Sequence, residues 1–317
     1  MTLLKHLPIV FLSYDETNAY SNFKHLSQDP SKSNLHRVQG VTGFDAAHLK
    51  ARQLANTEWF ITVDGDCKVH PLFWEQPFIP QGTVSFTWKS INLGNGLTYG
   101  NGGVKLWHSS FFDTHLGHEN NSTVLDFCYN KQTYQNYASC VSMTNPYDSY
   151  RTAHRSGFRE GVKLILKEGN PDSTIDIFDT HFSKSLNFLR LQAWASLGSH
   201  LDHGIDAQLG TLRALYHVHV TKLVSPTCVS SYASYDLALS RILKEESINF
   251  GEIIVLESTK LVDFYKDKFF QKTGLYFPKF GNKQSQFIVN SRLKEYQFPA
   301  DIYLPESYYD ASFFNTP

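Results

Sequence analysis

Two aspartates that directly follow an apolar segment are the strongest chemical feature of the sequence. Asp64 and Asp66 come after the apolar run 59–63 and are separated by Gly65. A buried strand ending in Asp-x-Asp places two carboxylates at the mouth of a parallel sheet, where ligands of such folds bind. Oxygen ligands of this kind suit Mg²⁺ or Mn²⁺, which neutralise a departing diphosphate. A turn that uses Asp for its conformational preference is the alternative interpretation.

The elements around this pair predict the sheet that positions it. A first apolar run, 8–12, ends in the polar residues 13–16, and an Ala-rich stretch, 45–55, has the spacing of a helix capped by Asp45. Strand, helix and strand in this order favour a parallel α/β sheet with right-handed crossovers. We therefore expect residues 13–16 and the two aspartates at the same edge of the sheet.

Residues 7–107 resemble a nucleotide-sugar glycosyltransferase of the GT-A fold. The end of the first strand, the helix with His48 and Arg52, and the Asp-x-Asp pair stand in that family's order. The resemblance implies an α/β fold with a Rossmann-type mixed sheet flanked by helices. It also implies a set of donor-binding residues, namely Ser13, Tyr14, Asp15, His48, Arg52, Asp64 and Gly102.

The same resemblance suggests how the donor is held. Tyr14 is expected to stack on the base, Asp15 to lie near the base or ribose, and Arg52 to face the diphosphate. An aromatic ring and a carboxylate can stack on and hydrogen-bond a pyrimidine, so a uridine diphosphate sugar is the expected donor. Guanine remains an open alternative, as does a solvated helix position for Arg52.

The metal site implied by the resemblance is built around Asp66, with Asp64 supporting the metal or the ribose. GT-A enzymes often recruit a C-terminal histidine as a further ligand. His217 or His219, in a strand-like stretch, is expected to supply it, and His217 is our first choice. The expected cofactor is Mn²⁺ or Mg²⁺. Burial in the core or placement on the surface is the alternative for either histidine.

A candidate general base is implied on the acceptor side. The segment 157–161 resembles the helix start where the family places a carboxylate, so Glu160 is the candidate base for an inverting transfer. Asp148 and Asp179 are rival candidates, and a solvated helix face is the alternative for Glu160. The Gly-rich segment 99–107 resembles the loop that lines the sugar and acceptor side.

The acceptor is suggested by a narrower resemblance. Residues 9–66, 155–167 and 194–210 are similar to phage-type (TET-associated) glycosyltransferases that modify hydroxymethylated pyrimidines in DNA. Consistent with this, five cations recur at i, i+4 and would form one basic stripe on a helix. They are Arg151, Arg155, Arg159, Lys163 and Lys167. Double-stranded DNA is therefore the expected acceptor, held by Arg151, Arg155 and Arg159; a solvated helix face is the alternative.

The overall composition limits these interpretations. The net charge is −1, so no global basic field indicates nucleic acid. The four cysteines form no metal-binding spacing, and the apolar run 7–12 is too short for a bilayer, so we expect a cytoplasmic protein with reduced thiols. A polysaccharide, lipid-linked or protein acceptor remains an alternative. So do a nucleotidyltransferase or phosphoesterase and an inactive sugar- or DNA-binding module.

The chain is expected to divide at residue 224. Residues 1–224 form the predicted GT-A-like donor-binding and catalytic domain, with helices over 155–167, 180–197 and 206–216. Residues 225–317 form a predicted C-terminal extension that packs on this domain and contributes to acceptor binding. It has helices near 235–244 and 259–272, followed by an aromatic tail.

Overall fold

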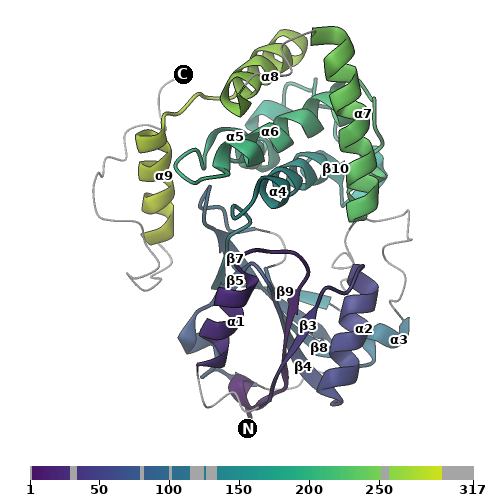
Figure 1. Cartoon of the computed structure of the whole chain (residues 1–317), viewed down its shortest axis with the longest axis vertical. Helices are drawn as coiled ribbons and strands as arrows, with labels where there is room; N and C mark the ends of the chain where they lie inside the picture. Colours follow the sequence, from purple (N-terminus) through teal and green to yellow (C-terminus); the bar gives the residue numbers. More distant parts are fainter. Residues whose placement is uncertain are drawn as a thin grey trace.

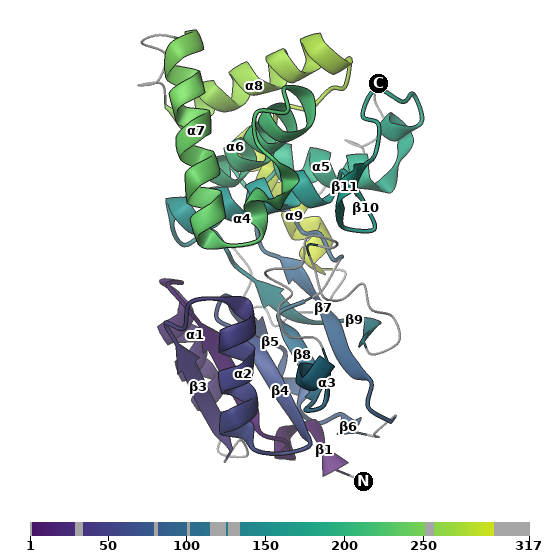
Figure 2. The same cartoon turned by 90° about the vertical axis from the view of Figure 1, so that its right-hand side faces the viewer.

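The computed structural model describes residues 2–28, 34–78, 82–99, 102–114, 125, 134–250 and 257–294. In Figure 1 the chain forms a sheet-containing half below a helical half, and Figure 2 shows the same division from the side. We call these the sheet half, up to residue 144, and the helical half, from residue 150. No described helix combines the length and apolar character needed to cross a bilayer.

A seven-stranded mixed sheet organises the sheet half. Its strands, in spatial order, are β3 (Leu35–Gln39), β2 (Ile9–Ser13), β4 (Trp59–Asp64), β8 (Val104–His108), β7 (Ser85–Asn92), β9 (Tyr134–Thr144) and β5 (Cys67–Val69). β2 pairs in parallel with both β3 and β4, whereas β8 is antiparallel to β4 and β7. β9 is parallel to β7 and antiparallel to β5. The predicted α/β class with a mixed sheet is confirmed.

Helices cover both faces of this sheet because the buried strands are apolar on both sides. Along β2, Ile9 and Phe11 belong to one core cluster together with residues of α1 (Ala19–Ser27). Val10 and Leu12 belong to another, with residues of α2 (Phe44–Ala55) and α3 (Phe111–Thr114). The predicted helix 45–55 is confirmed, except that Gly43, with φ of 98°, takes the N-cap position instead of Asp45.

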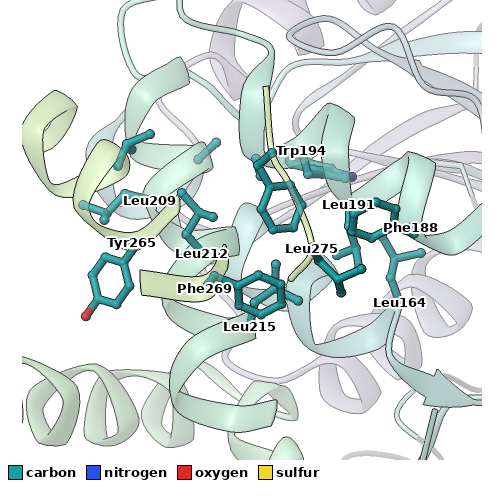
Figure 3. Packing of buried hydrophobic residues seen from close by; sticks show 14 of the residues in the cluster. Leu164, Phe188, Leu191, Trp194, Leu209, Leu212, Leu215, Tyr265, Phe269 and Leu275 are labelled. Carbon is teal, nitrogen blue, oxygen red and sulfur yellow. The ribbon is translucent and has the colours of Figure 1, made fainter. Parts of the chain in front are cut away.

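Six longer helices form the helical half. They are α4 (Tyr150–Lys163), α5 (Leu186–Ser196), α6 (Gly204–Ala214), α7 (Tyr232–Phe250), α8 (Ser258–Thr273) and α9 (Asn282–Lys294). Figure 3 shows residues of α5, α6 and α8 meeting in one apolar cluster, with Trp194, Leu212 and Phe269 among them. Residues on both sides of position 224 therefore share a core.

Short elements complete the fold. They are β1 (Thr2–Leu3) paired with β6 (Pro77–Phe78), β10 (Leu166–Lys167) paired with β11 (Asn170–Thr174), and the helical turns η1 (Leu4–His6), η2 (Pro71–Phe73), η5 (Phe182–Lys184), η6 (Leu215–Val220) and η7 (Pro226–Val229).

Several predicted elements differ from the structure. The helix expected over 155–167 begins at Tyr150 and ends at Lys163, so Lys167 lies in β10 and does not extend the basic row. The helix expected over 180–197 is a short turn followed by α5. The stretch around His217 and His219 is not strand-like, because η6 continues α6 as a π-helix. Helix α9 was not anticipated.

Glycines allow α4 and α6 to cross at very short distance. A Cβ added at Gly157 would lie 1.9 Å from the carbonyl oxygen of Ala207, and one at Gly210 would lie 2.0 Å from that of His154. Both contacts are with backbone atoms, which cannot turn aside as a flexible side chain does. The crossing therefore requires glycine from both helices.

We predict that Gly157→Ala destabilises the protein by about 3 kcal/mol, because the clash outweighs the roughly 1 kcal/mol that alanine contributes to helix propensity. Thermal unfolding measures the effect. Gly281→Ala is the control, since a Cβ there meets no atom closer than 3.9 Å. Equal unfolding temperatures for Gly157→Ala and the wild type would contradict the close crossing.

Candidate functional site

A pocket lies where β2 and β4 end, between the sheet half and the helical half. Its cavity volume is about 550 Å³, which is within the range of small-ligand sites. The sheet half contributes the ends of β2 and β4 and the start of β8, and the helical half contributes one face of α4 and the start of α7. The predicted meeting of the two strand ends at one edge is thus seen in the structure.

The pocket collects many, but not all, of the predicted site residues. Those that line it are Ser13, Tyr14, His48, Asp64, Asp66, Gly102, Arg155, Arg159 and Glu160. Those that do not line it are Asp15, Arg52, Asp148, Arg151, Asp179, His217 and His219. Gly100 and Asn101 of the predicted Gly-rich segment lie outside the described residues.

Asp64 ends β4 and is neutralised by a lysine that sequence reasoning missed. Lys105 Nζ lies 2.7 Å from Asp64 Oδ2, and the lysine is only 5% exposed. Lys105 stands opposite Thr62 in the antiparallel pairing of β8 with β4. The sequence feature that could have identified Lys105 was a lysine beside apolar residues in a predicted strand. The pairing of β8 with β4, which brings it to Asp64, could not be predicted from the sequence.

Asp66 is held by hydrogen bonds, whereas Asp64 is held by an ion pair. Thr144 Oγ1 donates to Asp66 Oδ2 at 2.5 Å, and Cys67 Sγ donates to Oδ1 at 3.5 Å. Burial raises the pKa of Asp66, and the nearby charge of Asp64 raises it further. Within the described residues no cation forms an ion pair with Asp66. Its ionised form would therefore be stabilised by a cation brought into the pocket.

Asp64 and Asp66 suit a divalent ion that takes only one or two of its ligands from the protein. Among the described residues, no group of three or more His, Cys, Asp or Glu side chains could hold a metal. Mg²⁺ and similar ions are often bound by one or two carboxylates, with substrate phosphates and water supplying the other ligands. Asp66, desolvated and without a cation, fits this arrangement, with Asp64 beside it. Such an ion would supply charge neutralisation for a diphosphate.

The structure does not bring the predicted histidines to these carboxylates. His217 is buried in the helical half, where its Nε2 lies 2.7 Å from the hydroxyl oxygen of Tyr265. Burial lowers the pKa of His217 to about 4 and that of His219 to about 3. Both histidines follow α6 in the π-helical turn η6, away from the residues that line the pocket.

Glu16 is a pocket carboxylate that sequence reasoning passed over. Its Oε2 accepts a hydrogen bond of 2.8 Å from the backbone N–H of Tyr14. A Cβ added at Gly65 would lie 2.8 Å from the same oxygen, so glycine between the aspartates makes room for this carboxylate. Burial raises the pKa of Glu16 to about 7. The sequence feature that could have identified Glu16 was its position in the polar run 13–16, directly after the first predicted strand.

Glu160 is held at the helical wall of the pocket by a chain of hydrogen bonds. Trp194 Nε1 donates to the hydroxyl oxygen of Tyr99 at 2.6 Å, and the Tyr99 hydroxyl donates to Glu160 Oε2. Lys163 Nζ lies 3.7 Å from Glu160 Oε1. Helices α4 and α5 and the segment before β8 meet here, although the residues are far apart in sequence. Neither Tyr99 nor Trp194 was a predicted site residue.

Asp148 and Asp179, the other candidate bases, accept hydrogen bonds from the backbone outside the pocket. Asp148 Oδ2 accepts a hydrogen bond of 3.1 Å from the backbone N–H of Asn18, which ties the segment before α4 to the N-cap of α1. Asp179 is exposed, and its Oδ1 accepts from the backbone N–H of His181 at 2.9 Å.

Two predicted arginines are also engaged outside the pocket. Arg52 Nη1 lies 2.8 Å from Asp113 Oδ1, so Arg52 joins α2 to α3. Arg151 lies 2.7 Å from Asp236 and 3.5 Å from Asp15. The basic row on α4 is therefore not uniformly solvated: Arg151 is paired on the outside, whereas Arg155 and Arg159 line the pocket.

Tyr14 meets an aromatic partner from the helical half. Its ring lies 5.2 Å from that of Tyr232, the first residue of α7, and the guanidinium of Arg155 lies 3.9 Å from the Tyr232 ring centroid. Tyr14 is 36% exposed. The aromatic pair thus joins the end of β2 to the start of α7 at the pocket.

A buried polar network holds the helical wall behind the pocket. Arg213 on α6 makes two hydrogen bonds to Glu246 on α7, of 2.7 and 2.8 Å. Arg213 Nη1 also lies 3.0 Å from His154 Nε2 on α4, and His154 Nδ1 lies 2.6 Å from the Tyr235 hydroxyl on α7. Burial lowers the pKa of His154 well below its usual value, and Arg213 lowers it further. The network connects α4, α6 and α7.

Comparison with known proteins adds a partial structural similarity. No protein-family model matches the chain, and no curated protein matches it significantly. One solved structure similar to it is that of a glycosyltransferase involved in the glycosylation of the major capsid of PBCV-1. The similarity covers 43% of this chain and 93% of the other, at 15% identity and a TM-score of 0.32. This is too low to carry an assignment, so the function is argued from the pocket.

We predict that Glu16→Gln raises the stability of the protein near pH 8 and changes it little near pH 4. Because the folded state raises the pKa of Glu16 from 4.5 to about 7, its contribution is favourable below pH 4.5 and is lost as the pH rises toward 7. Glutamine cannot ionise, so it should recover about 1–3 kcal/mol at the higher pH.

The measurement is thermal unfolding of both proteins at the two pH values, with Glu257→Gln, an exposed substitution, as the control. A Glu16→Gln effect that does not depend on pH would contradict the burial of this carboxyl group.

Proposed function

We propose that this protein is a metal-dependent glycosyltransferase that moves a sugar from a nucleotide-sugar donor to a hydroxyl group. The observation that supports it most is Asp66, a pocket carboxylate that has no cation partner among the described residues and lies two residues after the buried strand β4. It faces the same cavity as Glu160, which stands on the opposite, helical wall. A pocket with a metal-binding end and a separate hydrogen-bonded carboxylate suits a diphosphate leaving group and an attacking hydroxyl.

A uridine diphosphate sugar is the proposed donor. Tyr14 presents a partly exposed ring at the end of β2, next to Tyr232, and a base can stack on such a ring. Lys105 and the bound ion would compensate the diphosphate charge near Asp64 and Asp66. The sugar would then extend toward Glu160. Asp15 forms an ion pair with Arg151. Its proposed contact with the base or ribose therefore requires the carboxylate to bind Arg151 and the ligand at the same time.

Glu160 is the proposed general base. In the transfer, the bond between the sugar and the diphosphate breaks, the acceptor oxygen bonds to the sugar carbon, and the hydroxyl proton passes to Glu160. The hydrogen bond donated by Tyr99 fixes the orientation of the Glu160 carboxyl group. Tyr99 and Trp194 are thus positioning residues in this proposal.

The proposed acceptor is a hydroxymethylated pyrimidine in DNA, with a polysaccharide, lipid-linked or protein hydroxyl as the alternative. Placement of Arg155 and Arg159 along the pocket is compatible with a phosphate next to the modified base. Because the two arginines line a pocket, a base in a duplex would have to leave the stack to reach Glu160. Arg151 contributes to this contact only if its pairing with Asp236 is given up.

We predict that Asp66→Asn weakens Mn²⁺-dependent binding of uridine diphosphate about a hundredfold or more, because the desolvated metal-binding charge is lost. Calorimetry with and without Mn²⁺ measures it. The unfolding temperature should not fall, since burial already disfavours the charged form of Asp66. Asp172→Asn, on exposed β11, is the matched control and should bind normally. Normal Mn²⁺-dependent affinity in Asp66→Asn would exclude Asp66 as a ligand.

We also predict that Glu160→Gln lowers sugar transfer by about 10²- to 10⁴-fold, the usual contribution of a general base, while leaving donor binding intact. Tyr99→Phe should cause a smaller loss, because it removes only the hydrogen bond that orients Glu160. Transfer is followed as nucleoside diphosphate release with hydroxymethylated DNA as acceptor, and Glu257→Gln serves as control. If Glu160→Gln transfers sugar at the wild-type rate, another group is the base.

A further inference from the structure

The corner of the pocket where α4 meets the start of α7 has the features of an anion site. Arg155 comes from the second turn of α4, and its guanidinium carbon stacks 3.9 Å from the ring centroid of Tyr232, the first residue of α7. Both residues line the pocket, as does Arg159 one turn further along α4. This corner lies on the helical wall, whereas Asp64 and Asp66 belong to the sheet half.

Arg155 has no carboxylate partner in the part of the chain that the structure describes. Its Nε is buried and has no hydrogen-bond partner, and no carboxylate forms an ion pair with it among the described residues. Burial lowers the pKa of Arg155, and the nearby charge of Arg159 lowers it further. Arg151, one turn earlier on the same helix, differs in being paired with Asp236 and Asp15. A half-buried cation whose Nε is shielded from water and has no partner is costly, so this position favours a bound anion.

The start of α7 offers further donors at the same corner. Ser231 caps the helix, because its Oγ accepts from the backbone N–H of Ser234 at 3.1 Å. The backbone N–H groups of Tyr232 and Ala233 belong to the first turn, where no acceptor exists within the helix, and both residues line the pocket. A 19-residue helix directs the positive end of its dipole here. Anions bind at such helix starts.

Three acidic residues act on this corner through their charges. Asp15 acts on Arg155, and Asp15, Glu16 and Asp66 act on Tyr232. Asp15 is itself paired with Arg151 at 3.5 Å. These carboxylates belong to the sheet half, whereas Arg155 and the start of α7 belong to the helical wall.

We propose that Arg155, Arg159 and the start of α7 form a phosphate-binding subsite distinct from the metal site at Asp64 and Asp66. Planar guanidinium groups and backbone N–H groups suit phosphate oxygens. The phosphate belongs either to the nucleotide donor or to a phosphate ester on the acceptor. The identity of that source rests on the proposed function, but the subsite itself rests on the geometry of the pocket.

The subsite is tested by calorimetric titration of the full-length protein with inorganic pyrophosphate, in the presence of a chelator that removes divalent ions. We expect binding in the millimolar range or tighter, weakened at least about tenfold in Arg155→Met. Arg241→Met is the matched control, because Arg241 is an exposed cation of α7 that does not line the pocket, and this variant should bind as the wild type does. Arg155→Lys should recover part of the lost affinity.

A second readout separates ligand binding from a structural role. Arg155→Met removes a half-buried charge that has no ion-pair partner among the described residues, so its unfolding temperature without ligand should equal or exceed that of the wild type. A lowered temperature together with unchanged pyrophosphate affinity would overturn the proposal. So would failure of the wild type to bind pyrophosphate, or equal losses of affinity in Arg155→Met and Arg241→Met.

Competition then identifies the source of the phosphate. If the donor supplies it, uridine diphosphate with Mn²⁺ should displace pyrophosphate. If the acceptor supplies it, pyrophosphate should still bind to the protein saturated with uridine diphosphate, and a short oligonucleotide should displace it. Asp66→Asn should bind pyrophosphate normally under metal-free conditions, so a failure of the glycosyltransferase proposal is distinguishable from a failure of the subsite.

Discussion

The negative charge at the end of β4 is the constraint on which the rest of the pocket depends. The first five residues of this strand are buried, and its chain then places Asp64 and Asp66 directly in the cavity. Lys105 compensates Asp64 because β8 runs antiparallel to β4 and brings the lysine alongside. Asp66 instead receives hydrogen bonds from Thr144 and Cys67. One aspartate is therefore neutralised by the protein, and the other retains the capacity to attract a cation.

On helix α4 the same four-residue spacing places glycines against α6 and arginines in the pocket. Gly157 and Gly161 are spaced by four residues and face α6, where any side chain would meet backbone atoms. Arg155 and Arg159 have the same spacing on another side of the helix and line the pocket. Because α4 lies so close to α6, the two helices hold a fixed crossing, and Glu160 has a set place on the helical wall. Packing and the placement of charge are thus properties of a single helix.

Part of this arrangement follows from local sequence patterns. The apolar runs before Ser13 and Asp64 predicted two neighbouring parallel strands, and the shared edge at which their polar ends meet follows from that topology. The pairing of Lys105 with Asp64, and the chain from Trp194 through Tyr99 to Glu160, depend on contacts between elements distant in sequence. No periodicity encodes such contacts.

The same reasoning explains the predictions that the structure places differently. A row of cations at i, i+4 indicates a shared helix face but does not say what that face contacts. The ion pair of Arg151 and the buried Nε of Arg155 could therefore not be predicted from the sequence. A histidine between valines has the pattern of a strand, yet η6 extends α6 as a π-helix that buries His217 and His219. In these cases tertiary packing decided the outcome over local pattern.

The contact between Arg213 and His154 determines which nitrogen of the imidazole carries the hydrogen. Arginine can only donate, so His154 Nε2 must be the acceptor, and the hydrogen resides on Nδ1, which donates to the Tyr235 oxygen. His154 precedes Arg155 on α4, and Tyr235 lies one turn after Tyr232 on α7. A second proton on this ring would turn an acceptor toward a guanidinium into a competing donor. The contact between α4 and α7 at this point therefore depends on one tautomer of His154, and burial together with the charge of Arg213 disfavours a second proton by lowering the pKa of this ring.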